Sequence, residues 1–152
     1  MSKDYPAISD AQDKRAAELF RAAPDIMHGH RTVTQAAQTP KALDVKTTEL
    51  MALAVAIVQR CEGCVVFHTK QALSHGATRE ELCDAIAVAI EMGGGPATVY
   101  GADALAAYDS FSGEPLTIKP WNCDDSMRVD TPRPWLTLKS VVLSSGCRFR
   151  RH

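Results

Sequence analysis

The sequence has no long run of uncharged, apolar residues. A transmembrane helix needs about 20 of them, and no segment of the 152 residues reaches that length. The opening residues, MSKDYPAISDAQDKRAAELF, also lack the apolar stretch of a signal peptide. We therefore expect no membrane partner and a cytoplasmic location.

Strong net charge is missing as well. Lys and Arg number 17 and Asp and Glu number 18, so the formal net charge is −1. Such a chain has no overall field that would attract nucleic acid, and we expect no nucleic-acid partner. Hydrophobic residues make up 45% of the sequence, which is enough to bury the core of one domain without a metal or a disulfide framework.

Cysteines are few, odd in number and unevenly spread, at positions 61, 64, 83, 123 and 147. This distribution fits a reducing compartment better than a secreted disulfide scaffold. A close CxxC pair in such a protein is more typical of catalysis or metal binding than of a structural role.

The first part of the chain predicts helices separated by a turn. Ser9 or Asp10 is expected to cap a helix that runs to about Ala23 and ends at Pro24. Residues 25–39 predict an irregular turn that leads into a modest helix. The stretch TTELMALAVAIVQR, after Asp44 or Thr47, is apolar nearly all round and predicts a helix buried on most sides.

Three further helices complete the predicted all-α fold. One runs from CEGC to a stop at Gly76, and the next is capped by Thr78, with Glu81 as its capping-box partner. The run Gly93-Gly94-Gly95-Pro96 breaks that helix. The helix capped by Thr78 has an expected core face of Leu82, Ile86, Ala89 and Ile90. The last helix, from about Ala97 to Asp109, has an expected core face of Val99, Ala102, Leu105 and Ala106. The MGGGP run lacks the Lys and Ser or Thr of a phosphate-binding loop, and we expect no cofactor.

The composition changes near Gly113, where prolines become frequent. We predict one helical domain over residues 1–112. Residues 113–152 are predicted to be a Pro-containing tail that is disordered or not native, and no function is assigned to it.

Four reactive side chains interrupt the most hydrophobic part of the sequence, namely Glu49, Cys61, Cys64 and His68. Offsets of three and seven residues return to nearly the same side of a helix, so the two thiols and the imidazole share a face. A helix start stabilises a thiolate. A turn near Gln59-Arg60 would bring Glu49 back against this face, where it could accept a proton.

Other interpretations of these residues stay open. The two cysteines could be small core residues, or zinc could bind Cys61, Cys64 and His68 together with Cys83 or Glu49. The remaining candidates have simpler explanations: His28 and His30 as solvated polar residues, His75 as a cation near a helix C-terminus, and Cys83 as a packed core thiol.

The block from Thr47 to Asp109 resembles a known family. The helix with Glu49, the Cys61-x-x-Cys64-x-x-x-His68 spacing, the phrase SHGATREELCDAI and the MGGGPA break are similar to the alkylhydroperoxidase D-like (AhpD-like) branch of the carboxymuconolactone decarboxylase family. The upstream FRAAPDIMHGHRTV resembles the leading helices of that family.

The resemblance implies an AhpD-like helical bundle that assembles as a homo-oligomer, a trimer or a hexamer, with the site near a subunit interface. It implies that Cys64 attacks a peroxide or disulfide and that Cys61 resolves the product as an intramolecular disulfide. Glu49 and His68 would form the proton relay. The sequence departs from well-studied peroxidase members at Gly63, where those have a histidine.

The leading hypothesis is a thiol-dependent antioxidant oxidoreductase. Its substrate would be a peroxide, and a dithiol such as a lipoyl group or a thioredoxin-like protein would restore the thiols. Two alternatives differ in chemistry. One is a lyase acting on a carboxylated lactone with Glu49 and His68 as acid and base, and the other is a non-enzymatic zinc-binding or redox-sensing protein.

Overall fold

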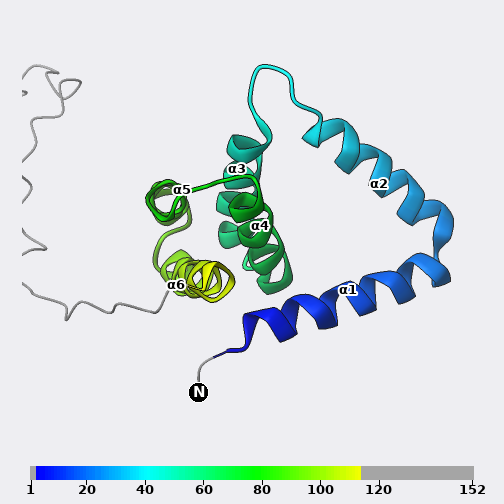
Figure 1. The fold of residues 1–152 in the computed structure, drawn as a ribbon, viewed down its shortest axis with the longest axis horizontal. Helices are drawn as coiled ribbons and strands as arrows, with labels where there is room; N and C mark the ends of the chain where they lie inside the picture. Colours follow the sequence, from blue (N-terminus) through cyan, green and yellow to red (C-terminus); the bar gives the residue numbers. More distant parts are fainter. Residues whose placement is uncertain (1–2, 114–152) are drawn as a thin grey trace, which may run out of the picture. The chain divides into compact units, whose positions relative to one another are not determined.

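The protein folds into α-helices throughout the part described by the computed structural model, residues 3–113, and that part contains no strand. The predicted all-α fold is confirmed. The predictions for the tail lie outside the described residues. The six helices are α1 (Tyr5–Ala22), α2 (Pro24–Gln38), α3 (Val45–Val58), α4 (Glu62–Ser74), α5 (Arg79–Gly93) and α6 (Gly95–Ser112) (Figure 1).

Helix caps explain where several of these elements begin and end. Asp44 caps α3 by accepting a hydrogen bond from the Thr47 N–H. Thr78 and Glu81 form the predicted capping box of α5. After α4, Gly76 has a φ of +81°, a left-handed conformation that glycine adopts without steric cost. The helix boundaries around these caps match the sequence-based predictions.

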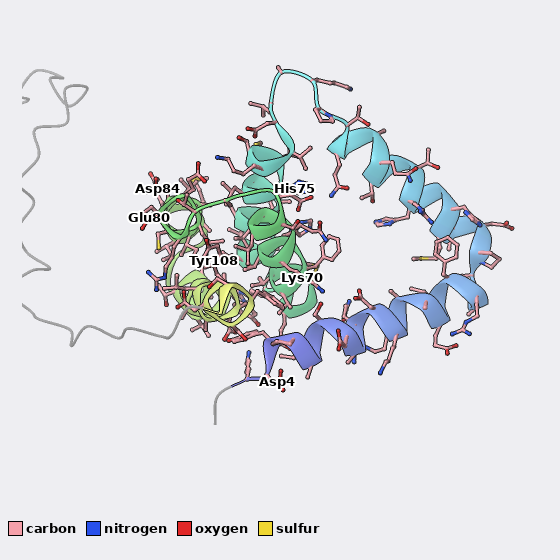
Figure 2. The ribbon with its side chains drawn as sticks, viewed as in Figure 1. Asp4, Lys70, His75, Glu80, Asp84 and Tyr108 are labelled. Atoms are coloured by element: carbon pink, nitrogen blue, oxygen red, sulfur yellow. A yellow bond between two sulfur atoms is a disulfide. The ribbon has the colours of Figure 1, made fainter. Side chains whose placement is uncertain are left out.

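The first two helices differ from the prediction. Helix α1 begins at Tyr5 because Asp4, at the start of the helix in Figure 2, accepts a hydrogen bond from the Ala7 N–H. Residues 24–38 form one continuous helix and no irregular turn. Pro24 does not merely end α1, since its fixed φ suits the first turn of α2.

Helices α3, α4, α5 and α6 pack together around the main core, and we call these four helices the bundle. Side chains fill the space between them in Figure 2, where Tyr108 of α6 is labelled. The Tyr108 hydroxyl donates to the Ala77 carbonyl oxygen at 2.9 Å, which ties α6 to the connection between α4 and α5. The buried core residues are Leu53, Ala56, Ile57, Val65, Leu82, Ile86, Ala89, Ala97, Ala104 and Tyr108.

The predicted faces of α3 and α6 differ in outcome. Helix α3 is buried or half-buried on most sides, as predicted, and Met51, Val55 and Val58 form one exposed stripe along it. On α6 the expected core residues Val99 and Ala102 are exposed. The core face consists of Ala97, Gly101, Ala104, Ala107 and Tyr108, small residues for the most part, which let α6 lie close to α5.

Helices α1 and α2 form an arm (residues 5–38) that joins the bundle at its two ends (Figure 1). At the start of α1, Tyr5 is buried beside Val66 and Ala107, and its hydroxyl donates to Asp103 at 3.0 Å. Burial, and then this hydrogen bond, raise the pKa of Tyr5 to about 12. The N-terminal end of the arm is therefore anchored by apolar and polar contacts together.

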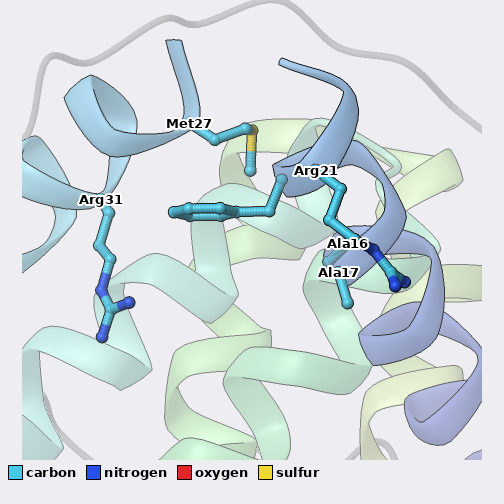
Figure 3. A pocket seen from close by; sticks show the side chains of 6 residues that line it. Ala16, Ala17, Arg21, Met27 and Arg31 are labelled. Atoms are coloured by element: carbon cyan, nitrogen blue, oxygen red, sulfur yellow. The ribbon is translucent and has the colours of Figure 1, made fainter. Parts of the chain in front are cut away.

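Farther out, α1 and α2 face one another across a hollow of about 440 Å³. Figure 3 shows Met27 and Arg31 of α2 on one side, and Arg21, Ala16 and Ala17 of α1 on the other. No helix in the described part of the chain is long and apolar enough to cross a membrane.

Candidate redox site

The turn between α3 and α4 places the first cysteine. Arg60 has a φ of +57°, and its N–H donates to the Ile57 carbonyl while the Cys61 N–H donates to the Ala56 carbonyl. These two bonds form a Schellman motif, which usually has glycine where Arg60 lies. The turn reverses the chain at the predicted position, so that Cys61 becomes the N-cap of α4.

Cys61 and Cys64 are joined by a disulfide at the start of α4, with their Cα atoms 5.2 Å apart. The Cys64 N–H donates to the Cys61 sulfur at 3.3 Å, so this sulfur occupies the place of an N-cap side-chain oxygen. In the reduced pair, the positive end of the helix dipole favours negative charge on sulfurs at this helix start, which includes Cys61 and Cys64. The pair is therefore suited to cycling between a thiolate form and a disulfide.

Glu49 of α3 is in contact with His68 of α4. The Nδ1 atom of His68 lies 2.7 Å from Oε2 of Glu49, and Glu49 is only 2% exposed. With its proton on Nδ1, the imidazole donates to the carboxylate and keeps Nε2 as a proton acceptor. A carboxylate that orients a histidine in this way is a common arrangement for general acid–base chemistry.

Gln38, the last residue of α2, adds a second donor to Glu49. Its Nε2 atom lies 2.6 Å from Oε1 of Glu49. Both carboxylate oxygens are thus engaged, which is how a buried carboxylate is accommodated. Sequence reasoning missed Gln38, because a single glutamine in a polar helix gives no pattern that points to a site.

A hollow of about 420 Å³ opens beside the disulfide, between α3 and α4, and we call it the site hollow. Cys61, Cys64 and His68 line it. Glu49 does not line it but is hydrogen-bonded to His68. The remaining wall is mostly apolar and consists of Thr48, Met51, Ala52, Val55, Ala56 and Gln59. The structure therefore brings the four predicted side chains into one connected arrangement.

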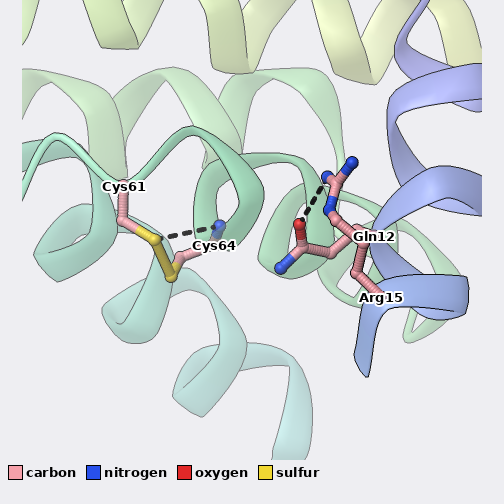
Figure 4. The surroundings of a disulfide bond; sticks show 4 residues. All are labelled: Gln12, Arg15, Cys61 and Cys64. Atoms are coloured by element: carbon pink, nitrogen blue, oxygen red, sulfur yellow. Dashed lines mark hydrogen bonds between the residues drawn. A yellow bond between two sulfur atoms is a disulfide. The ribbon is translucent and has the colours of Figure 1, made fainter. Parts of the chain in front are cut away.

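Gly63 lies between the two cysteines and faces α1. A Cβ atom at this position would lie 3.0 Å from the side-chain amide atoms of Gln12. Figure 4 shows Gln12 to one side of the disulfide, with its Oε1 accepting a hydrogen bond from Arg15 at 3.0 Å. The space next to Gly63 is thus occupied by a polar side chain from the arm.

Other reactive residues named in the sequence analysis lie apart from this site. His28 and His30 are exposed on α2, and His75 is the C-cap of α4. Cys83 is a free, half-buried thiol and not the packed core residue that we predicted, because it lies at the edge of the buried face of α5. Among residues 3–113, no group of three or more His, Cys, Asp or Glu side chains is arranged to hold a metal ion.

Comparison with known sequences gives two informative relatives. An uncharacterized protein of Cupriavidus necator is 41% identical over 112 residues, which are 74% of this chain and 99% of the relative. Uncharacterized protein 4 in the cox locus of Paracoccus denitrificans is 38% identical over 96 residues, covering 63% of this chain and 86% of the relative.

Solved structures agree with these matches. The apo form of a carboxymuconolactone decarboxylase family protein from Legionella pneumophila has a TM-score of 0.70 and 39% identity, over 73% of this chain and 99% of that one. A family protein from Thermotoga maritima, described with an antioxidative response as its suggested role, has a TM-score of 0.63 and 25% identity, over 70% and 91% of the two chains.

The profile of the carboxymuconolactone decarboxylase family matches residues 24–107, a segment that contains Glu49, both site cysteines and His68. The match and the solved structures are consistent with the alkylhydroperoxidase D-like branch that the CxxC spacing suggested. The chain belongs to the carboxymuconolactone decarboxylase family.

Proposed function

We propose that this protein is a thiol-dependent antioxidant oxidoreductase that reduces peroxides through Cys61 and Cys64. The observation that carries the proposal is the placement of the Cys61–Cys64 disulfide in the same hollow as His68, which is itself hydrogen-bonded to the buried Glu49. A dithiol needs a nearby base to form its thiolate and an opening through which a peroxide can enter. The suggested antioxidative role of the Thermotoga maritima relative also supports it.

The oxidative half-reaction follows from the chemistry of thiols. The Cys64 thiolate attacks the terminal oxygen of the peroxide, so that an S–O bond forms, the O–O bond breaks and an alcohol leaves with a proton. The Cys61 thiol then attacks the Cys64 sulfur. A disulfide forms and water leaves, so two thiols and one peroxide give one disulfide, one alcohol and one water.

Glu49 and His68 supply the proton transfers in this scheme. Nε2 of His68 accepts the thiol proton, and the buried carboxylate of Glu49 stabilises the resulting imidazolium through Nδ1. The same imidazolium returns a proton to the departing alkoxide. The hydrogen bond between His68 and Glu49 and the common hollow of His68, Cys61 and Cys64 support these roles.

The reductive half-reaction needs an external dithiol, for which a lipoyl group or a thioredoxin-like protein is suitable. Its thiolate attacks one sulfur of the Cys61–Cys64 disulfide, and its second thiol resolves the mixed disulfide. The protein returns to the dithiol state and the partner leaves as a disulfide. We also propose that the chain acts as a homo-oligomer, as the family resemblance implies.

Thiol counting with one equivalent of an alkyl hydroperoxide tests the proposal. The fully reduced chain has five cysteines, and we expect three titratable thiols after oxidation. Cys83→Ser is the matched control and should still lose two thiols, from four to two. Glu49→Gln and His68→Gln should slow the oxidation by about 100-fold, since general acid–base catalysis contributes at least that much.

Two results would contradict the proposal. A loss of two thiols that is unchanged in Cys64→Ser would show that another cysteine is oxidised. Turnover of a carboxylated lactone by the Cys61→Ser/Cys64→Ser double variant would instead favour the lyase chemistry.

A further inference from the structure

Glu49 is held by two hydrogen bonds that come from different parts of the chain. His68 of α4 engages Oε2 and Gln38 of α2 engages Oε1, at 2.7 and 2.6 Å respectively. The last torsion of a glutamate side chain is broad and sets no single orientation of the carboxylate plane. The two hydrogen-bond partners therefore set this orientation, and Gln38 is the partner that holds Oε1.

The orientation of the Gln38 amide follows from the same contact. Its oxygen facing Glu49 would place two acceptors together, so the NH₂ group has to face the carboxylate. A hydrogen bond to a charged group is among the stronger ones in proteins. Gln38 is half-buried, which shields this bond from water.

The place of Gln38 in the fold gives this contact added importance. Helix α2 packs against α1 and, within the described residues, has no buried side chain. Ile26 and Val33 on this helix are 71% and 68% exposed. The Gln38 amide is thus a specific tie between the end of the arm and the Glu49–His68 pair.

We propose that Gln38 is the positioning residue of the Glu49–His68 pair. By holding Oε1 of Glu49, it keeps Oε2 on Nδ1 of His68 and so keeps Nε2 of His68 as the proton acceptor in the site hollow. The kinetic part of this inference rests on the proposed function, whereas the geometric part does not. A consequence is that displacement of the end of α2 disorders the relay.

The test compares two substitutions on the same helix in the full-length protein. Gln38→Met keeps the length of the side chain and removes the donor. Gln35→Met is the matched control, because Gln35 lies one turn earlier, is exposed, and has no side-chain hydrogen bond among the described residues. Gln38→Asn keeps the amide but shortens its reach, and serves as the second variant if Gln38→Met does not fold.

The first readout is the ¹⁵N NMR spectrum of the histidine rings, measured at about pH 9, where imidazoles are generally neutral. The His68 signals are assigned by their loss in His68→Gln. We expect the wild type to show the Nδ1–H tautomer and Gln38→Met to lose that preference, with Gln35→Met unchanged. An unchanged His68 spectrum in Gln38→Met would overturn the proposal.

The second readout is the rate of thiol loss with an alkyl hydroperoxide. We expect a fall of about tenfold in Gln38→Met, a smaller fall in Gln38→Asn, and none in Gln35→Met. If the wild type is active and Gln38→Met reacts equally fast, the positioning role is wrong. If the spectrum changes but the wild type does not consume peroxide, the proposed function fails and the geometric role of Gln38 stands.

Discussion

Gly63 and Gly101 are both helical glycines, but they differ in what a side chain would meet. A Cβ at Gly63 approaches the end of the Gln12 side chain at 3.0 Å, and Gln12 is exposed and flexible. A Cβ at Gly101 would lie 2.7 Å from Cγ2 of Ile86, in the buried contact between α5 and α6. The first neighbour can move into solvent, whereas the second has no free space to enter.

We expect Gly63→Ala to stabilise the oxidised protein by about 0.5 kcal/mol, because alanine loses less backbone freedom on folding than glycine. Gly101→Ala should destabilise it by about 1–2 kcal/mol through overpacking. Urea unfolding of the two variants, compared with the wild type, measures both values. Equal effects of the same sign would contradict this assignment of the two contacts.

At the residue scale, the sequence predicted those site residues that break a pattern. Glu49 stands out as an acid within an apolar helix, and Cys61, Cys64 and His68 stand out by their spacing. Gln38 does not, because its role depends on how residues 39–44 return the chain from α2 to α3. The contact between Gln12 and Gly63 is equally invisible in the sequence, since it joins two helices that are distant along the chain.

At the element scale, the junction between α3 and α4 ends one helix and begins the next within three residues, 59–61. Arg60 ends α3 in a left-handed conformation, and Cys61 begins α4 as its N-cap. The redox pair is therefore also part of the helix cap. Because the Cys61 sulfur accepts the Cys64 N–H, a substitution at Cys61 changes both the disulfide and the cap.

A pair of substitutions separates these two contributions. Cys61→Ser and Cys61→Ala both remove the disulfide, but serine is a strong N-cap residue and alanine is not. We expect Cys61→Ser to be more stable than Cys61→Ala by about 1 kcal/mol in urea unfolding under reducing conditions. Equal stability of the two variants would mean that the N-cap interaction of Cys61 contributes nothing.

Helices with clear capping and stop residues were predicted correctly, whereas the helix without them was not. Helix α5 was predicted correctly because Thr78 and Glu81 form a capping box and Gly94 ends the helix. Residues 24–38 lacked such signals, and Gly29 suggested a turn, yet an exposed glycine lowers helix stability by only about 1 kcal/mol. On α6, Leu105 and Ala106 do pack against the core, and Val99 and Ala102 do not. The face was only partly predicted because alanines occur both at close helix contacts and at exposed positions.

At the scale of the whole molecule, several helices carry exposed large apolar side chains, and α3 and α2 are two of them. On α3, Met51, Val55 and Val58 follow one another at offsets of four and three residues, so they form one stripe. Ile26 and Val33 are seven residues apart and share a face of α2. Large apolar side chains that are exposed on one helix face are often found at an interface. This exposure supports the proposed homo-oligomer, with α2 as one of the surfaces that a second copy covers.

We therefore expect the full chain to sediment as a trimer or a hexamer at micromolar concentration. Val33→Lys places a charge on the apolar face of α2 and should lower the mass toward that of a single chain, because burying an unpaired charge is costly. Sedimentation velocity measures the change directly, and circular dichroism shows whether the helices remain.

Gln35→Lys is the matched control for this experiment. It adds the same charge to the same helix, but two residues along a helix correspond to about 200°, so the new lysine lies on the opposite face. We expect it to leave the assembly intact. If the wild type sediments as a monomer, the exposed stripes do not mediate self-association. If both lysine variants dissociate alike, net charge and not the apolar face controls assembly, and the interface lies elsewhere than on the Ile26 and Val33 face.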